Sequence, residues 1–377
     1  MIEVKVRNCD METVIGFPCT EKYLAEKLRE VGITDELPPP LHVVEVLEGD
    51  GLELLAGKYL DLDEANYLGK LLEGMTNAQM DKFAVVARKE GFGSAKDLIN
   101  LTFNDQRYTL IQNIGDMTAV GRTHMITRNL AIPADKSKDA EYAKIGKELL
   151  ESGKGIWTEK GLLFVNDDIP FEEVYKGETF PAYAYKEHLL EMELDFLGAK
   201  EYLYLPEEDI AIKKALSRLG LEGPANCNAM MIYCNTTNGA YAELLENIVN
   251  GEDIYAVNAF AKRAEYLDDV EMFIAVADYA DVTSAKEATA LINHLDEFNY
   301  IDGISDEHEL GQHLVEYDSD YECADEVKDF IDYRDFGRYI CNEYNGQFVN
   351  SGFVYIPSGK SLEQIIDVEN DIKMGGM

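Results

Sequence analysis

The feature that most constrains the fold of this chain is an internal repeat. Residues 142–165 align without a gap with residues 333–356, at an offset of 191. Within this block Tyr142, Gly146, Gly155 and Gly161 coincide with Tyr333, Gly337, Gly346 and Gly352. Because glycine marks positions of special backbone geometry, three coinciding glycines argue against chance. We therefore expect the chain to contain two copies of one unit.

Two weaker matches occur in the same order along the chain. They are Phe17-Pro18 with Leu205-Pro206, and Ser94-Ala95-Lys96 with Ser284-Ala285-Lys286, followed after a short insertion by Leu98-Ile99-Asn100 with Leu291-Ile292-Asn293. The collinear blocks predict a tandem duplication of a unit of about 165 residues, which is long enough to hold its own hydrophobic core.

Periodicity gives the class of each unit. Residues 42–47 and 229–233 are typical of strands, residues 62–102 and 254–294 of compact helices, and residues 346–356 of a hairpin with its turn at Asn350-Ser351-Gly352. We predict an α+β fold in two tandem copies of an elongated unit, each with small antiparallel sheets flanking a compact helical bundle. The expected divisions are a first copy at 1–166, a linker at 167–188, a second copy at 189–357 and a C-terminal tail at 358–377.

The net charge restricts the partners of this protein. The chain has 72 acidic and 34 basic residues, for a formal net charge of −38. Direct binding to nucleic acid or to anionic lipid is not expected, because both need basic side chains to neutralise phosphates. The charge is concentrated in residues 189–377, and residues 296–335 alone contain fifteen acids and two bases. A partner that is itself basic is the natural expectation.

The chain gives no sign of export or of a membrane segment. Residues 1–5 alternate like a strand instead of forming a basic region followed by an apolar block. No apolar run reaches the roughly 18 residues that a transmembrane helix needs. The six cysteines form no Cys-x-x-Cys pair and are sparse for a disulfide framework. We expect a reduced, cytoplasmic protein.

Two segments resemble metal sites only in part. His308 and His313 lie in a segment similar to a zinc-protease motif, but they are five residues apart, which places them on different faces of a helix. The run 318–329 begins like a calcium loop, yet Cys323 replaces the required glycine and Asp329 the final glutamate. We expect no bound metal.

A glycine-rich segment at 91–96 lacks the third glycine and the Gly-Lys-Ser/Thr of phosphate-binding loops. We predict instead that Gly91 ends one helix and that Ser94 caps the next. No nucleophile motif is present, so the expectation is a protein without catalytic residues and without a cofactor.

The acidic pattern itself is the strongest functional signal. Glu322, Asp325, Glu326, Asp329 and Asp332 follow one another at i, i+3, i+4, i+7 and i+10, so a continuous helix would align them in one stripe. Like charges at this spacing destabilise a helix. A solvated face remains an alternative, and for Asp332 and Asp335 both helix capping and recognition remain open. The candidate target-binding residues are Asp306, Glu307, Glu309, Glu316, Asp318, Asp320, Glu322, Asp325, Glu326, Asp329, Asp332 and Asp335.

Residues 324–339, followed by Gly346, Phe348 and the run 352–354, resemble the C-terminal signature of ArdA antirestriction proteins. The resemblance implies an acidic, non-catalytic DNA mimic that occupies the DNA groove of type I restriction–modification enzymes. It also implies dimerisation near the signature, and the candidate interface residues are Phe330, Tyr333, Phe336 and Tyr339. The first copy departs from this pattern, because its residues 141–147 carry much less acid.

Three classes of function follow for testing. The first is a DNA-mimic inhibitor from a phage or mobile element, acting in the cytoplasm of a host bacterial cell. Its partner would be a protein with a basic DNA-binding groove, first a type I restriction–modification complex and next another defence complex such as a CRISPR effector. The others are an acidic adaptor that uses its tyrosines as anchors and an enzyme with an acidic active site. The chain could form a homodimer or an intramolecular pseudo-dimer.

Overall fold

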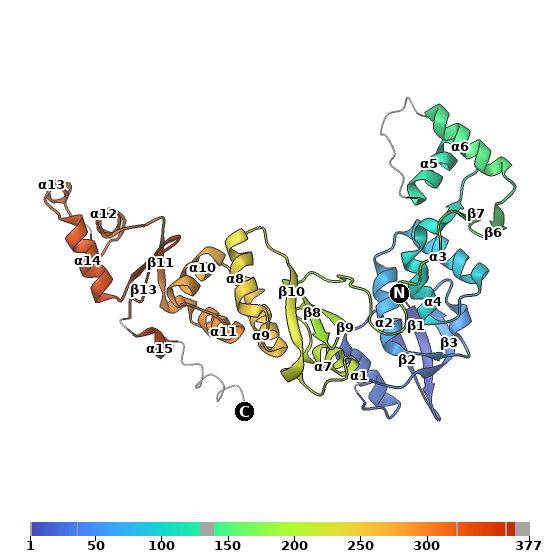
Figure 1. Ribbon diagram of the computed structural model, residues 1–377, viewed down its shortest axis with the longest axis horizontal. Helices are drawn as coiled ribbons and strands as arrows, with labels where there is room; N and C mark the ends of the chain where they lie inside the picture. The colour runs from blue at the N-terminus through green and yellow to red at the C-terminus, as the bar shows by residue number, and fades with distance from the viewer. Residues whose placement is uncertain (1, 36, 129–138, 322, 359, 366–377) are drawn as a thin grey trace. The chain divides into compact units, whose positions relative to one another are not determined.

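The protein has an α+β fold with fifteen described helices and several small antiparallel sheets (Figure 1). A computed structural model describes residues 2–35, 37–128, 139–321, 323–358 and 360–365. The chain divides into two compact units, Met1–Tyr185 and Lys186–Met377. Each unit is described on its own below.

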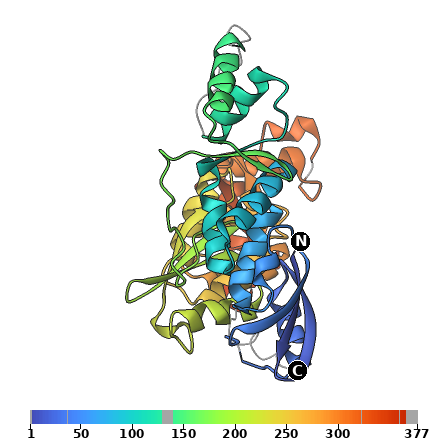
Figure 2. The same ribbon diagram turned by 90° about the vertical axis from the view of Figure 1, so that its right-hand side faces the viewer.

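The first unit begins with a four-stranded sheet in the order β2-β1-β3-β4 and ends with a three-stranded sheet in the order β5-β7-β6. Its elements are β1 (Ile2–Asn8), β2 (Met11–Phe17), α1 (Glu21–Glu30), β3 (Leu41–Glu48), β4 (Tyr59–Leu60), α2 (Leu62–Glu73), α3 (Asn77–Glu90), α4 (Ala95–Phe103), β5 (Tyr108–Ile111), α5 (Met117–Thr127), α6 (Asp139–Glu151), β6 (Ile156–Thr158) and β7 (Gly161–Val165). In both views the helices α2 to α4 lie between the two sheets (Figures 1 and 2).

The second unit has two three-stranded sheets, in the orders β10-β8-β9 and β11-β13-β12. Its elements are β8 (Leu190–Phe196), β9 (Ala199–Leu205), α7 (Asp209–Arg218), β10 (Asn228–Cys234), α8 (Gly239–Val249), α9 (Ile254–Ala264), α10 (Val270–Tyr279), α11 (Ala285–Asn293), β11 (Asn299–Asp302), α12 (Glu307–Tyr317), α13 (Asp325–Lys328), α14 (Tyr333–Glu343), β12 (Gln347–Val349), β13 (Gly352–Tyr355) and α15 (Leu362–Ile365). The two units thus follow nearly the same order; among the described elements, α8, α13 and α15 occur only in the second unit and β4 only in the first.

Buried polar contacts also coincide between the units. The Asn66 side chain of α2 makes two hydrogen bonds with the backbone of Cys19. The Cys19 N–H donates to the Asn66 side-chain oxygen at 2.9 Å, and the Asn66 side-chain nitrogen donates to the Cys19 carbonyl at 3.1 Å. Asn258 of α9 makes the same pair of bonds, both 2.9 Å, with the backbone of Glu207. Each bond pair joins the residue two positions after the end of a sheet strand to the helical bundle. These shared contacts are what a duplication predicts; the duplication itself stays a prediction.

Local predictions about helix ends and turns are confirmed. Gly91 ends α3 in the left-handed conformation with φ +72°, and the Ser94 side chain accepts from the Asp97 N–H at the start of α4. The predicted hairpin is present: Gln347–Val349 pairs with residues 352–354, and the turn is Asn350-Ser351, because Gly352 already belongs to β13. These features depend on neighbours in the chain, which is why the sequence alone could predict them.

One detail of the predicted repeat is wrong. The helices α4 and α11 have equal lengths of nine residues and equivalent serine caps, so no insertion separates them. Asn100 is therefore the sixth residue of α4, whereas Asn293 is the last residue of α11. The two Leu-Ile-Asn triplets occupy different turns of equivalent helices, because a short string can recur without sharing a structural position.

Most of the segment predicted as a linker, residues 167–188, packs along the first unit. Asn104 exchanges two backbone hydrogen bonds of 2.8 Å with Glu172, and Asn100 does the same with Tyr175. The Phe180 ring stacks on Tyr67 at a centroid distance of 4.8 Å. Residues up to Tyr185 belong to the first unit by their contacts. The segment still connects the units, but most of it is part of the first unit's folded surface.

Within the described part of the chain, every helix is too short or too polar to cross a bilayer.

Candidate functional site

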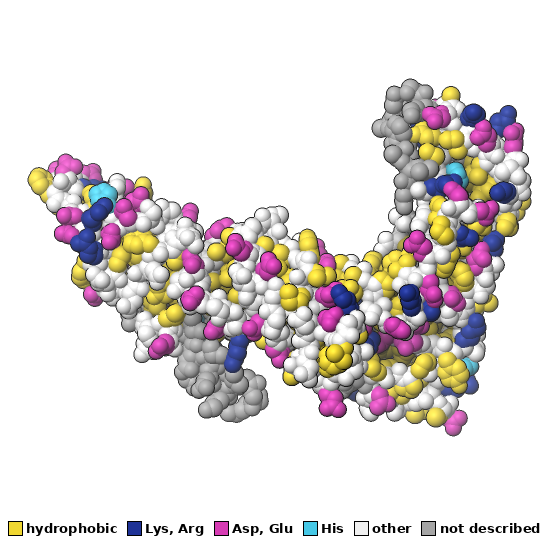
Figure 3. All heavy atoms as spheres, in the orientation of Figure 1, with side chains coloured by type: hydrophobic (Ala, Val, Ile, Leu, Met, Phe, Trp, Pro, Cys, Tyr) yellow, Lys and Arg dark blue, Asp and Glu magenta, His cyan; other side chains and the backbone are white. Residues whose placement is uncertain are grey.

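The candidate site is the lobe formed by residues 299–356, which we call the acidic lobe. It contains fourteen acidic and three basic residues. Two helices, α12 and α14, pack on the sheet β11-β13-β12, and the side chains of Leu310, Leu314, Ile340 and Phe353 form a small core between them. Figure 3 shows acidic side chains gathered over this helical end of the second unit.

Close backbone contact fixes how the two helices cross. A Cβ atom on Gly311 would lie 1.9 Å from the carbonyl oxygen of Tyr333, and one on Gly337 would lie 1.8 Å from that of Glu307. Only glycine fits at either position without displacing backbone. The crossing therefore sets which faces of α12 and α14 point outward and carry the acidic residues.

Several predicted acids stabilise the ends of helices. Asp306 caps α12 by accepting from the N–H groups of His308 and Glu309, at 2.8 and 3.0 Å. These N–H donors, chiefly that of Glu309, lower the pKa of Asp306, so its carboxylate stays charged. Asp332 caps α14 by accepting from the Asp335 N–H at 3.1 Å. Capping is thus confirmed for Asp332, and its recognition role remains open.

Three acids of the lobe have a basic partner. Asp325 pairs with Lys328 at 2.9 Å and Asp335 with Arg338 at 2.9 Å, both along one helical turn, while Arg334 lies 4.0 Å from Asp306. The Lys328 ammonium lowers the pKa of Asp325. In each pair at least one side chain is more than half exposed, so the pairs contribute little to stability and can exchange for contacts with a partner.

Most of the other predicted acids have no basic partner. Among the described residues of the acidic lobe, the carboxylates without a Lys or Arg within ion-pair distance include Glu307, Glu309, Glu316, Asp318, Asp320, Glu326, Asp329 and Asp332. Glu309 and Asp318 accept backbone N–H groups, and Glu316 accepts from Gln312. Glu326 and Asp329 are exposed. The lobe therefore presents uncompensated negative charge to solvent.

Residues 325–335 do not form the continuous helix that a single acidic stripe would require. The helix α13 spans only Asp325–Lys328, a turn follows, and α14 starts after Asp332. Glu322 lies outside the described residues. A single stripe would need one helix through all five acids. The helix is interrupted because Asp332 caps a new helix, α14. Helical spacing alone does not reveal such an interruption.

The four candidate interface aromatics divide into two kinds. Phe330 is 86% exposed and Tyr339 56% exposed. In contrast, Phe336 packs beside the small core against Tyr321, and Tyr333 donates its hydroxyl to the Lys328 carbonyl at 3.1 Å. Phe330 and Tyr339 are thus the exposed members of the set, and Tyr333 and Phe336 are half-buried. Tyr317, at the end of α12, is 75% exposed as well, although its spacing from Leu310 and Leu314 suggests a buried position.

The equivalent lobe of the first unit, residues 108–165, provides an internal reference. We call it the mixed-charge lobe, because it contains seven acidic and eight basic residues. Its helices α5 and α6 also cross at two glycines: a Cβ on Gly121 would lie 2.0 Å from the Tyr142 carbonyl oxygen, and one on Gly146 2.1 Å from that of Met117. The two lobes share a backbone plan and differ in charge.

Acids of the mixed-charge lobe are accompanied by basic partners. Lys144 and Glu148 approach to 3.8 Å and Lys147 and Glu151 to 3.7 Å along α6. Arg122 pairs with Asp139 across the two helices. Basic and acidic side chains are also interspersed over this part of the first unit in Figure 3. This lobe lacks the excess of carboxylates on which the predicted recognition depends.

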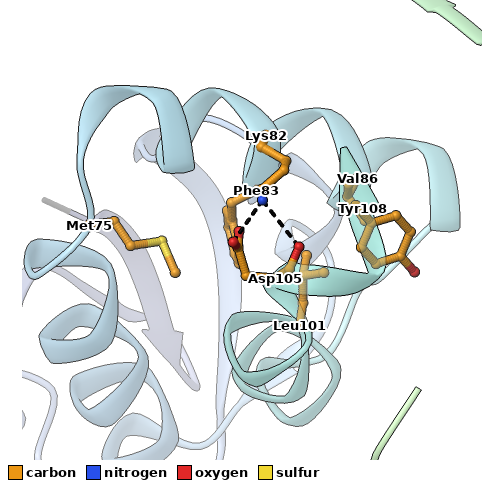
Figure 4. Close-up of a pocket in the computed structure, with 7 residues that line it drawn as sticks. All are labelled: Met75, Lys82, Phe83, Val86, Leu101, Asp105 and Tyr108. Carbon is orange, nitrogen blue, oxygen red and sulfur yellow. Dashed lines mark hydrogen bonds and ion pairs between the residues drawn. The ribbon is translucent and has the colours of Figure 1, made fainter. Parts of the chain in front are cut away.

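A second candidate site is a small pocket in the first unit (Figure 4). Lys82 points its ammonium group at Asp105, with 2.7 Å to the carboxylate and 3.1 Å to the backbone carbonyl. Met75, Phe83, Val86, Leu101 and Tyr108 complete the lining. Burial lowers the pKa of Lys82, although the Asp105 charge opposes that shift. The pocket is mostly apolar and Lys82 is satisfied within it, so its arrangement is that of a buried ion pair.

The histidines of the predicted zinc-like segment both lie on α12. His308 packs edge-on against the Tyr333 ring, and His313 packs against the Tyr317 ring in a tilted arrangement. No cluster of three or more His, Cys, Asp or Glu side chains that could hold a metal ion occurs in the described ranges.

No protein-family model matches the chain. No curated protein matches it either.

Proposed function

We propose that this protein is an acidic inhibitor that occupies the DNA-binding groove of a host defence complex, with its carboxylates standing in for phosphates. The observation that carries the proposal is the contrast between the two lobes. The mixed-charge lobe has the same helix crossing without the excess acid, so the fold does not require the charge. Uncompensated like charges repel one another, and their concentration in one lobe favours a role in recognition.

The amount of charge suits a DNA-binding groove. Duplex DNA carries one negative charge per about 1.7 Å of its axis. A net charge of −38 therefore matches the charge of roughly 65 Å of duplex. Complementary charge would speed association with a basic groove and select against other partners.

The first proposed target is a type I restriction–modification complex, as the resemblance of residues 324–356 suggests. Another DNA-handling defence complex such as a CRISPR effector is the alternative of the same kind. Both have basic grooves, and the acidic lobe by itself does not favour one over the other.

Competition with DNA tests the proposal. Labelled duplex DNA is bound to the purified target, and the protein is titrated in at several salt concentrations. We expect mutual exclusion. DNA binding loses affinity steeply with salt because condensed counterions are released. A protein with fixed, sparser charges condenses fewer ions, so raising salt should shift the competition toward the protein while slowing its association. A stable ternary complex of target, DNA and protein would refute groove occupancy.

One observation favours an adaptor as a second candidate. Trp157 on β6 is 69% exposed, whereas Phe348, at the equivalent position of the acidic lobe, packs against Phe353 at a centroid distance of 5.0 Å. An exposed tryptophan is a frequent anchor in protein interfaces. If Trp157→Ala removes binding to the target while charge reversal in the acidic lobe does not, the adaptor function replaces the inhibitor function.

A further inference from the structure

The acidic lobe presents one aromatic ring in an unusual way. Phe330 is 86% exposed, although it lies in a hydrogen-bonded turn and not at a chain end. Its N–H donates to the Val327 carbonyl at 3.0 Å, and the next N–H, of Ile331, donates to the Lys328 carbonyl at 3.2 Å. The Tyr333 hydroxyl donates to that same Lys328 carbonyl. The backbone that carries the ring is therefore held in place, while the ring itself packs on almost nothing.

Carboxylates lie on both sides of this ring in the sequence. Asp329 precedes it and Asp332 follows two residues later, and both are exposed. Asp332 is fixed as the cap of α14. The tip of the lobe thus combines a flat apolar ring with flanking negative groups. Exposure of this apolar ring to water is unfavourable. Its burial in an apolar pocket of a partner would lower the free energy.

The same combination occurs in a nucleotide that has left the DNA stack. An extruded base is a flat ring flanked by two phosphates, and enzymes that modify a base hold it in a pocket where it stacks between aromatic and apolar side chains. Phe330 has no polar edge, so it can match such a pocket by shape and stacking alone. A groove that only tracks the DNA backbone offers no such pocket.

We propose that Phe330 takes the place of an extruded base, inserting its ring into the base-binding pocket of a DNA-modifying partner while the neighbouring carboxylates contact the phosphate-binding residues around it. This inference rests on the proposed function and narrows the partner to a complex that flips a base. The tip of the lobe would then recognise a base-binding pocket, which negative charge alone cannot do.

The test uses the full-length protein and a purified, base-methylating type I modification complex, with inhibition of binding to labelled duplex DNA as the readout. Stacking of one base changes affinity by roughly 10- to 100-fold, so Phe330→Ala should weaken inhibition by about that factor. Phe330→Leu keeps an apolar side chain but not a flat ring, and it should lose nearly as much. Phe330→Tyr should stay within about threefold of the original protein.

Tyr317→Ala is the matched control, because Tyr317 is 75% exposed in the same lobe. It should leave inhibition within about threefold of the original protein, and thermal melting should be unchanged in all four variants since neither side chain is buried. A photo-crosslinking p-benzoylphenylalanine in place of Phe330 should attach to the base-binding pocket of the catalytic subunit. Attachment elsewhere would overturn the inference.

The outcomes separate the inference from the proposed function. If Phe330→Ala and Phe330→Leu inhibit as well as the original protein, while reversal of Asp320, Glu326 and Asp329 to lysine abolishes inhibition, the base-surrogate role is wrong and groove occupancy stands. Equal losses for Phe330→Leu and Tyr317→Ala would also overturn it. If the original protein does not exclude DNA from the complex, groove occupancy itself is refuted for this target, and the inference with it.

Discussion

The acidic lobe and the mixed-charge lobe have the same crossing of two helices on a three-stranded sheet, yet residues 299–356 have eleven more acids than bases and residues 108–165 have one more base than acids. Both crossings depend on a pair of glycines in backbone contact. Both leading helices, α5 and α12, begin with an aspartate that accepts two backbone N–H groups. A few contact positions therefore determine how the two helices cross in each lobe. The surface charge can vary without a change in this crossing.

The attachment of each lobe to its helical bundle shows the same freedom. In the first unit Arg88 of α3 contacts Asp50, Glu53 and Glu159, and Lys160 reaches Asp81 at 2.9 Å. In the second unit Asp278 of α10 occupies the position equivalent to Arg88 and accepts two hydrogen bonds of 3.2 Å from Asn350. Ion pairs attach the lobe in the first unit, and hydrogen bonds attach it in the second. The lobe of the second unit is therefore held in place although the basic residues are replaced.

The largest expected effect tests whether the lobes differ in function. Reversal of three exposed acids, Asp320→Lys, Glu326→Lys and Asp329→Lys, should weaken inhibition by about 100- to 1,000-fold, because like charges would then face a basic groove. Titration against DNA on the purified target measures the change.

The matched control is reversal of Glu141, Glu148 and Glu151 to lysine in α6. It should change inhibition by less than about threefold, since the mixed-charge lobe has no excess of acid. Equal losses from both triple variants would mean that the acidic lobe has no privileged role.

The next effect tests whether the lobes share their packing. Gly337→Ala should destabilise the acidic lobe by about 2–3 kcal/mol, because its Cβ would meet the Glu307 carbonyl oxygen and force the helices apart. Gly146→Ala should cost the mixed-charge lobe a similar amount. Denaturant unfolding, followed by hydrogen exchange in each lobe, measures both.

Gly220→Ala provides a control with open space around the added methyl group, although its positive φ gives it a strain cost of its own. A large loss for one crossing glycine and none for the other would contradict a common packing plan.

A smaller effect concerns the buried ion pair of the first unit. Met272 and Leu295, both partly buried apolar residues, stand at the positions equivalent to Lys82 and Asp105. Lys82→Met alone should cost about 1–2 kcal/mol by leaving Asp105 unpaired, a loss moderated by the 35% exposure of that side chain. The double variant Lys82→Met/Asp105→Leu should be neutral or stabilising, as measured by chemical unfolding.

The same pair predicts a pH dependence with a definite sign. Burial lowers the folded-state pKa of Lys82 below its ordinary value of 10.5, so the unfolded chain binds the proton more tightly. Stability should therefore rise with pH between that lowered pKa and 10.5, and Lys82→Met should remove this rise. A rise that persists in Lys82→Met would have to come from another group.

The smallest effect is a pH difference between the lobes. Burial, assisted by Arg128, lowers the pKa of His124 in α5 below 6.5, whereas the equivalent residue of α12 is Leu314. The unfolded chain then binds the proton more tightly, so the mixed-charge lobe should lose less than about 1 kcal/mol as pH falls below 6.5. The indole resonance of Trp157, the only tryptophan, reports this lobe by NMR.

His124→Leu should abolish the loss and leave the acidic lobe unchanged. If the indole resonance shows the same acid sensitivity in His124→Leu, the pH dependence has a different origin.

The local features and the charge of this protein could be read from its sequence. Helix ends at Gly91 and Ser94, the β12–β13 hairpin and the α+β class were predictable, because caps, turns and periodicity depend on residues close in the chain. The concentration of acid in residues 296–335 needed no structure at all. The coinciding glycines were also visible in the sequence. The close backbone contact that requires glycine at the helix crossings was not.

Which acids and aromatics are exposed to a partner depends on contacts that form only in the folded chain. It showed that Asp306 and Asp332 serve as caps, that the helix breaks after Lys328, and that Phe330 is exposed while Phe336 is packed. It also placed residues 171–185 against α2 and α4, where Asn100 and Asn104 hold backbone about 70 residues away in the chain. Such contacts join segments distant in sequence, so no local pattern encodes them.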